Sequence, residues 1–295
     1  MPNQEPNLSS LYISPLDKCN LNCKICYTQK TANFLSQEQI LDFVDRFMKK
    51  NNLETVTFCG GEVFLLSWFP NLLNQLTDQD LLVEVITNGT INRLDEIAKP
   101  NLVNLIISID GVKVDHNLNR GKGNFDKSWK FLLKAIELGF HFEIFTVVTS
   151  HNFDHLDQFE VWLTEQLGEL PTITYHPRKP LKYLENHPVD NLMEDEVKSD
   201  QFGFLSSKQM AQLSQTKKVF PPVNLGCHQL SVMSDGSVYG CCEGFTRLGI
   251  ISDPIDSLIH NYSKNLQQPP ACSKHCRGCA EPNFACGIIP SQSKK

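Results

Sequence analysis

The sequence predicts an α/β fold built on a parallel sheet, followed by a small cysteine-rich region with a β-hairpin. Three observations support this. Short β-rich runs alternate with amphipathic stretches as far as Tyr175. Several of these runs are almost continuously apolar, as in strands that are buried on both faces. Seven of the 11 cysteines then lie in residues 227–295. Six strands alternating with helices indicate either an open doubly wound sheet or a barrel.

The predicted strands and helices follow one another in order. The strands are Leu11–Ser14, Thr55–Phe58, Leu82–Thr87, Val103–Ile109, His141–Thr149 and Thr172–Tyr175. The first helix begins after Ser36, where Ser36 and Gln39 form a capping box before an apolar face at helical spacing. Further helical stretches are Ser67–Leu76, Ile91–Ala98, Phe125–Leu138 and Phe153–Leu167, with Gly139 and Gly168 placed as C-caps.

The character of the sequence changes after Tyr175. The stretches His176–Pro188 and Glu194–Asp200 are interpreted as a solvated connector, and 206–214 as one short helix. Two short runs flank Asp235–Gly236, a common tight-turn pair, and predict a hairpin over residues 229–240. A last helix is expected near residues 256–262. We therefore predict two domains, residues 1–200 and 201–295.

Composition narrows the functional class. The net charge of −6 argues against a partner recognised through nucleic-acid phosphates, which requires a basic face. No apolar run reaches the roughly 18 residues of a membrane span. The first ten residues lack the apolar core of a signal peptide, so we expect a cytoplasmic protein in a reducing compartment. Disulfides are rare there, which leaves metal or catalytic roles for the cysteines.

Three cysteines lie in the loop that follows the first strand. Cys19, Cys23 and Cys26 are separated by three and two residues. In a βα unit this loop opens at the carboxyl edge of the sheet, where active sites of such folds lie. Three thiolates can hold three corners of an iron–sulfur cube and leave one iron without a protein ligand. A zinc knuckle completed by a distant ligand and three buried thiols are the alternatives.

This segment, from Cys19 to Tyr27, resembles the signature of the radical S-adenosylmethionine (SAM) superfamily. Further matches follow successive strands: Thr57–Glu62 with its Gly-Gly-Glu, Thr87–Thr90, Ser108–Gly111, and then Arg120–Gly121. The resemblance implies a partial six-stranded βα barrel of the TIM type. It also implies a [4Fe–4S] cluster with an open iron, at which SAM is cleaved to a 5′-deoxyadenosyl radical that abstracts hydrogen from a substrate.

The same resemblance implies the contacts of the cofactor. The backbone at Gly60 and Gly61 and the carboxylate of Glu62 would hold the amino group of SAM. Ser108 and Arg120 would contact its ribose and carboxylate, and Ile25 would line the adenine side. The remaining cofactor-binding candidates come from the matching turns: Thr87, Asn88 and Asp110. Val63 stands where proline is common, a change that we expect to be tolerated. Cys59 is interpreted as a small core residue.

The C-terminal cysteines resemble the SPASM and twitch extensions of radical SAM maturases, which hold one or two auxiliary iron–sulfur clusters. The first predicted ligands are Cys227, Cys241, Cys276 and Cys279, and the next are Cys272 and Cys286. The pattern departs from the family because Cys272 precedes the pair and no final cysteine follows Cys286. Zinc ribbons are the alternative, since Cys-x-x-Cys pairs also bind zinc.

Cys242 follows the hairpin directly. In the branch that matures sulfatases an aspartate base stands there, so the cysteine weighs against that activity. Two interpretations remain open, a cluster ligand and a catalytic residue such as a hydrogen-atom donor.

The resemblance favours a peptide or small protein as substrate, in the maturation of a ribosomally made peptide. Because only 18 residues precede Cys19, we expect a peptide's leader to be bound elsewhere on the chain or by a separate leader-peptide-binding protein. An electron donor such as flavodoxin or ferredoxin is also expected, but no nucleic acid and no membrane. A small-molecule radical SAM enzyme, for example a twitch-type alcohol dehydrogenase, is the first alternative. A non-catalytic zinc or redox-sensing protein is the second.

Overall fold

The computed structural model describes residues 8–178, 203–216, 229–240, 242 and 247–266. Within them one sheet runs in the order β6-β5-β4-β3-β2-β1-β7-β8-β9. The strands are β1 (Ser10–Ile13), β2 (Thr55–Phe58), β3 (Leu82–Thr87), β4 (Val103–Ser108), β5 (His141–Val148), β6 (Ile173–Pro177), β7 (Gln229–Val232), β8 (Ser237–Tyr239) and β9 (Arg247–Ile250). Strands β1–β6 are all parallel, which confirms the predicted α/β partial barrel.

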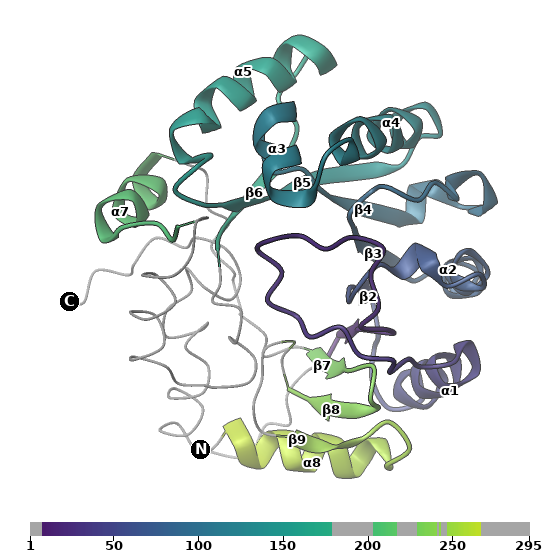
Figure 1. The fold of residues 1–295 in the computed structure, drawn as a ribbon. Coiled ribbons are helices and arrows are strands. Elements are labelled where there is room, and N and C mark those ends of the chain that lie inside the picture. The colour runs from purple at the N-terminus through teal and green to yellow at the C-terminus, as the bar shows by residue number, and fades with distance from the viewer. Residues whose placement is uncertain (1–7, 179–202, 217–228, 241, 243–246, 267–295) are drawn as a thin grey trace.

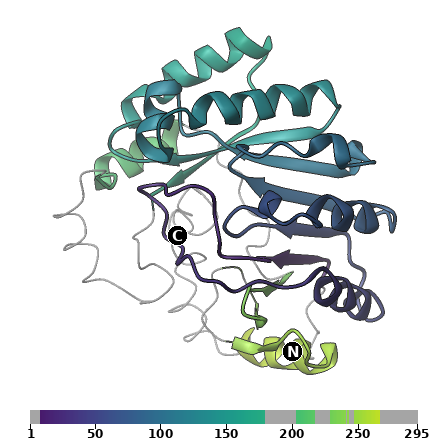
Figure 2. The same cartoon turned by 45° about the vertical axis from the view of Figure 1, so that its right-hand side comes forward.

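Helices cover the outer side of this sheet. They are α1 (Gln37–Met48), α2 (Phe69–Thr77), α3 (Lys113–Arg120), α4 (Asn124–Glu137), α5 (Leu156–Leu167), α7 (Ser207–Thr216) and α8 (Ile255–Leu266). Figure 1 shows α1, α2, α4 and α5 around the outside, with the loop between β1 and α1 on the inner side. In Figure 2 the same loop lies beyond the carboxyl ends of the strands. The cysteine loop is therefore at the expected edge.

The core lies between the sheet and the outer helices. Phe58 on β2 contacts Phe69 of α2 edge to face, with ring centroids 5.3 Å apart. Phe43 and Phe47 of α1 are also fully buried. Successive side chains of a strand point to opposite faces of the sheet. Apolar strand residues such as Phe58 therefore point outward to the helices. The intervening residues, such as Thr57, face the inside of the barrel and leave it more polar.

The C-terminal hairpin continues the barrel sheet. Strand β7 pairs in parallel with β1, aligning Val232 with Ile13, and β8 returns antiparallel to β7. The turn contains the predicted pair, with Gly236 at φ +82° and the Asp235 carboxylate accepting a hydrogen bond from the Ser237 amide at 2.9 Å. This places Cys242, just after β8, near the first strand of the barrel. The division into two domains stays a prediction.

Three local predictions differ from the structure. Residues 91–98 were expected to be a helix but contain only the 3-10 turn Leu94–Glu96, where Asn92 caps the Leu94 amide at 3.1 Å. Helix α3 was not predicted, because its sequence is rich in polar residues. The stretch 176–188 was expected to be solvated. Its first residues belong to β6, and His176 is 9% exposed and Arg178 is 2% exposed; residues 179–188 lie outside the described part.

Among the described residues, no helix combines the length and the apolar character that crossing a membrane requires.

Candidate active site

A cavity of about 310 Å³ opens at the carboxyl ends of the barrel strands. Ten of the sequence-predicted residues line it: Cys19, Cys23, Ile25, Cys26, Gly60, Gly61, Thr87, Asn88, Ser108 and Arg120. Cys242 lines it as well. These residues belong to separate motifs that follow different strands, and the fold brings them together in one cavity. Their roles in binding stay predictions.

The cysteine loop is fixed to the loop that follows β2. The Gly61 amide donates to the Leu16 carbonyl at 2.9 Å, and the Glu62 amide donates to the Lys18 carbonyl at 3.0 Å. A Cβ on Gly61 would overlap the Lys18 carbonyl, and one on Gly60 would crowd Leu16. The glycines are therefore needed where the backbone of the cysteine loop packs against them.

Glu62 is buried behind this contact, with 1% of its surface exposed. Its carboxylate accepts hydrogen bonds from Thr87 Oγ1 at 2.8 Å, from the Asn88 amide at 2.8 Å, and from the Phe64 amide at 3.2 Å. Burial raises the pKa of Glu62, and the bonds from Asn88 and Thr87 oppose this. The carboxylate was expected to contact an ammonium group in the cavity. It faces protein donors instead, and joins the end of β2 to the end of β3.

The sulfur atoms of the cysteine loop accept hydrogen bonds from the protein. Cys19 Sγ accepts from the Leu21 amide at 3.4 Å and from Asn88 Nδ2 at 3.7 Å. Cys26 Sγ lies 3.1 Å from the Thr28 hydroxyl. Donors of this kind are typical of the surroundings of iron–sulfur thiolates, whose negative charge they stabilise.

Burial shifts the pKa values of two cysteines in the loop. It raises the pKa of Cys19, and it raises that of Cys23 to about 11, although the charge of Arg120 lowers the latter in part. Metal ligation requires the thiolate form, so metal binding at these thiols would release protons. In the described residues, no group of three His, Cys, Asp or Glu side chains is placed to hold a single metal ion.

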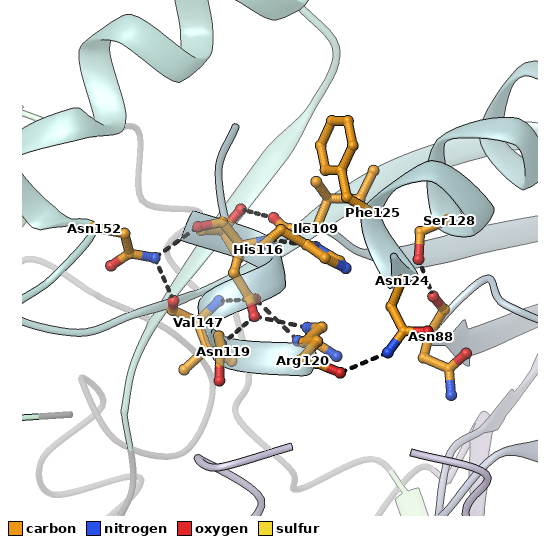
Figure 3. A network of polar contacts seen from close by, with 12 residues as sticks. Asn88, Ile109, His116, Asn119, Arg120, Asn124, Phe125, Ser128, Val147 and Asn152 are labelled. Atoms are coloured by element: carbon orange, nitrogen blue, oxygen red, sulfur yellow. Dashed lines mark hydrogen bonds and ion pairs between the residues drawn. The ribbon is translucent and has the colours of Figure 1, made fainter. Parts of the chain in front are cut away.

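Arg120 brings a positive charge to the wall of the cavity (Figure 3). Its Nε donates to Asp110 Oδ2 at 2.7 Å and its Nη2 donates to Oδ1 at 2.9 Å. Asp110 is fully buried and also accepts from Asn119 Nδ2 and, at 3.0 Å, from the Val147 amide. Burial lowers the pKa of Arg120, but the charge of Asp110 outweighs this and raises it above the ordinary value. Asp110, predicted to bind cofactor, lies behind Arg120 and orients it.

His116 completes this network from the other side (Figure 3). Its Nδ1 accepts a hydrogen bond from the Asp110 amide at 3.3 Å. Burial lowers the pKa of His116 to about 4, so the ring is neutral at physiological pH. The tautomer that accepts at Nδ1 carries its proton on Nε2. Asn152 Nδ2 also donates to the Asp110 carbonyl at 2.7 Å, so the turn that contains Asp110 is held on both sides.

The cavity also has lining residues near the ends of β1 and β2 and after the hairpin. Tyr12 and Cys59 line it together with Cys242. Burial raises the pKa of Tyr12 well above 10, and the nearby thiols and a hydrogen bond to Cys59 raise it further. Cys59 was expected to be a core residue, but it lies in the cavity wall because it follows β2 on the inner face of the barrel.

His176 of β6 and Phe145 of β5 also line the cavity. Their rings stack with centroids 3.9 Å apart and an interplanar angle of 19°. His176 was missed because it was assigned to the connector. Period-two alternation continued through Thr174 would have placed it on the inner face.

The remaining predicted ligands lie outside the described residues: Cys227, Cys241, Cys272, Cys276, Cys279 and Cys286.

The family follows from the sequence match. Residues 13–163 match the Radical SAM superfamily. The chain belongs to this superfamily. Its members are enzymes, and a [4Fe–4S] cluster and SAM are the cofactors that the superfamily implies. The cavity with its three cysteines is the candidate active site.

Similar proteins include both small-molecule and peptide enzymes. GTP 3′,8-cyclase from Aquifex aeolicus is 24% identical over 274 residues, which are 79% of this chain and 82% of that protein. The solved structure of anSMEcpe with bound AdoMet and Cp18Cys peptide aligns with a TM-score of 0.63 and 22% identity, over 91% of this chain and 86% of that one. Streptococcus suis SuiB bound to precursor peptide SuiA aligns with a TM-score of 0.64 and 13% identity, over 90% and 66%. These structural matches establish the fold.

Proposed function

We propose that this radical SAM enzyme abstracts hydrogen from a peptide, in the maturation of a ribosomally made peptide. The observation that carries the proposal is the single cavity in which three cysteines, two loop glycines and Arg120 meet. Cys19, Cys23 and Cys26 would hold the [4Fe–4S] cluster. When reduced, this cluster would supply the electron that cleaves SAM to methionine and the 5′-deoxyadenosyl radical, and the radical would take a hydrogen atom from the substrate to give 5′-deoxyadenosine.

The side chains of the cavity then have distinct tasks. Arg120, fixed by Asp110, offers a guanidinium group to the carboxylate of SAM, a favourable charge-assisted contact. Ser108 is placed for the ribose and Ile25 for the adenine. The backbone of Gly60 and Gly61 faces the amino group. Glu62 acts through its neighbours, because its carboxylate already has three protein donors.

The peptide substrate is supported by the fold shared with two enzymes solved with peptides bound. The second candidate is a small-molecule substrate, which the similarity to GTP 3′,8-cyclase over 79% of the chain favours. For a peptide, the leader would be bound elsewhere on this chain or by a separate protein. In both cases a low-potential electron donor such as flavodoxin or ferredoxin would reduce the cluster.

We further propose one or two auxiliary clusters held by Cys227, Cys241, Cys276 and Cys279, with Cys272 and Cys286 as additional ligands. Cys242 lines the reaction cavity beside Tyr12 and Cys59. This position supports a catalytic role for Cys242, such as hydrogen-atom donation to a substrate radical, over a role as ligand. Donation would leave a thiyl radical on Cys242, which one electron from the electron donor and a proton from solvent would return to the thiol.

Iron counting after anaerobic purification tests the cofactors. About eight irons per chain are expected for one auxiliary cluster and about twelve for two, at about four irons per cube. Reduction with dithionite in the presence of SAM should yield 5′-deoxyadenosine, and Cys23→Ala should abolish it. Zinc in place of iron, or 5′-deoxyadenosine from Cys23→Ala at the wild-type rate, would contradict the proposal.

The substrate class is tested by coexpression. If a short open reading frame adjoins the gene, its product is expressed with and without this enzyme and examined by mass spectrometry. A mass change that depends on Cys23, or a gain of deuterium from deuterated water where a thiol returns the hydrogen atom, supports the peptide. An unmodified peptide, together with turnover of a nucleotide such as GTP, would favour the small-molecule alternative.

A further inference from the structure

A hydrogen-bonded chain connects Glu62 to the sulfur of Cys19 through a single residue. Glu62 Oε2 accepts from the backbone amide of Asn88 at 2.8 Å, and Thr87 Oγ1 donates to Glu62 Oε1. The side chain of Asn88 extends the other way, and its Nδ2 donates to Cys19 Sγ at 3.7 Å. A buried carboxylate on the β2 loop thus fixes the backbone of a residue whose amide reaches the first cysteine.

The orientation of this amide is decided by Thr90. The Thr90 backbone N–H can only donate, and it lies 2.9 Å from Asn88 Oδ1. The Thr90 hydroxyl also donates to Oδ1 at 2.6 Å. Oxygen therefore faces Thr90, so the amide nitrogen must face Cys19. Asn88 Nδ2 donates its second hydrogen to Asn20 Oδ1 at 3.0 Å, and this bond favours the same orientation of the amide.

We propose that Asn88 is a positioning residue that raises the reduction potential of the SAM-binding cluster by donating an N–H to Cys19 sulfur. The inference rests on the proposed function, because it assumes a cluster on this cysteine. A cluster thiolate gains negative charge when the cluster is reduced, so an N–H directed at it stabilises the reduced state more than the oxidised state. Hydrogen bonds to cluster sulfurs are one of the general means by which proteins set these potentials.

The position of Asn88 favours this role. The residue is 7% exposed, so solvent weakens the contact little. Its backbone carbonyl accepts from Ser128 Oγ of α4 at 2.6 Å (Figure 3). The backbone of Asn88 is therefore held by Glu62 on one side and Ser128 on the other, and its amide stays at a fixed distance from Cys19.

Asn88→Asp tests the inference with little change of shape. Asp keeps an oxygen for Thr90 but replaces the N–H at Cys19 with a second oxygen. The expected result is a more negative midpoint potential. At a fixed solution potential, the ratio of reduced to oxidised cluster should fall about tenfold, which is about 59 mV for a one-electron couple. Asn88→Ala, which adds no charge, should shift the potential in the same direction by less.

The measurement is a redox titration followed by electron paramagnetic resonance of the cluster signal that Cys23→Ala removes. Ser128→Ala is the matched control, since it deletes a hydrogen bond to the backbone of the same asparagine. It should reduce the thermal stability and change the midpoint less than either Asn88 variant, because Thr90 still orients the side-chain amide of Asn88. An unchanged midpoint in both Asn88 variants, or an equal shift in Ser128→Ala, overturns the inference. If the wild-type protein has no signal that depends on Cys23, the proposed function fails instead.

Discussion

Two groups of residues around the cavity are held in different ways. The first group, which we call the frame, consists of the cysteine loop and the turns that Glu62, Asn88 and the buried pair of Asp110 and Arg120 hold together. The second group, the strand-end residues, consists of lining side chains that lie at or just after strand ends: Tyr12, Cys59, His176 and Cys242. We propose the frame as the cofactor-binding part. The strand-end residues present phenol, thiol and imidazole groups, which suit chemistry on a substrate. Each group can be disrupted separately.

The largest effect is expected at the frame, from Asp110→Asn. This change leaves the guanidinium of Arg120, only 10% exposed, without its counter-charge. Removal of one partner of a buried ion pair costs about 3–5 kcal/mol of unfolding free energy. Denaturant unfolding of the apoprotein measures it. Asp42→Asn is the control, because it breaks an exposed pair with Arg46 and should cost less than about 0.5 kcal/mol. Similar losses in both variants would mean that Asp110 does not anchor the frame.

Gly61→Ala should disrupt the frame next most strongly. The added methyl group overlaps the Lys18 carbonyl, so the cysteine loop must move away. Overpacking of this kind costs about 3 kcal/mol or less in stability, and the displaced loop should retain less iron after reconstitution.

Gly123→Ala separates collision from backbone strain. A Cβ there meets nothing within 4 Å, but the residue has φ +80°. It should cost about 1–2 kcal/mol through its left-handed backbone and leave the iron content unchanged. Wild-type iron in Gly61→Ala would refute the close packing of the two loops.

The frame was largely predictable from the sequence, because its residues occur in short motifs directly after strands. The three cysteines, Gly60, Gly61 and Arg120 all line the cavity, whereas Glu62 is buried behind it. Their binding roles stay predictions. Their second partners could not be predicted. The contact of Gly61 with Lys18 depends on how two loops pack, and Asp110 could be placed behind Arg120 only once α3 was known to form.

The strand-end residues were hardly predictable, for a physical reason. They belong to no local motif and meet only through the register of the sheet. Tyr12 and Cys59 are 47 positions apart in the chain, and Cys242 joins them because β7 pairs with β1. Such a pairing between distant strands leaves no local pattern, so Cys59 was assigned to the core and His176 to a connector.

The frame should also lose stability in acid through His116. Its folded pKa of about 4 lies below the ordinary 6.5, so the unfolded chain binds the proton first. Stability is therefore complete above about pH 6.5 and falls as the pH is lowered toward about 4. The loss is about 3 kcal/mol at most, since one pKa unit corresponds to about 1.4 kcal/mol. His116→Gln should flatten this part of a stability–pH curve, and His260→Gln, at an exposed position, should not. Parallel curves for all three proteins would exclude His116 as the source.

Substitutions of the strand-end residues should affect radical formation least. Cys242→Ala and Cys59→Ala leave the loops around the three cysteines in place, so 5′-deoxyadenosine formed without substrate should stay within about twofold of wild type, a difference of about 0.4 kcal/mol in barrier.

Only Cys242→Ala should lower the yield of modified product, because we propose this thiol as the hydrogen-atom donor. Cys59→Ala is the matched variant, since both thiols lie near Tyr12. In deuterated water, where thiols carry deuterium, wild-type product should gain a deuterium and Cys242→Ala product should not. Deuterium incorporation lost in Cys59→Ala alone would transfer the role to Cys59. Loss of iron in Cys242→Ala would identify Cys242 as a ligand of an auxiliary cluster. Both the frame and the strand-end residues would then contain metal ligands.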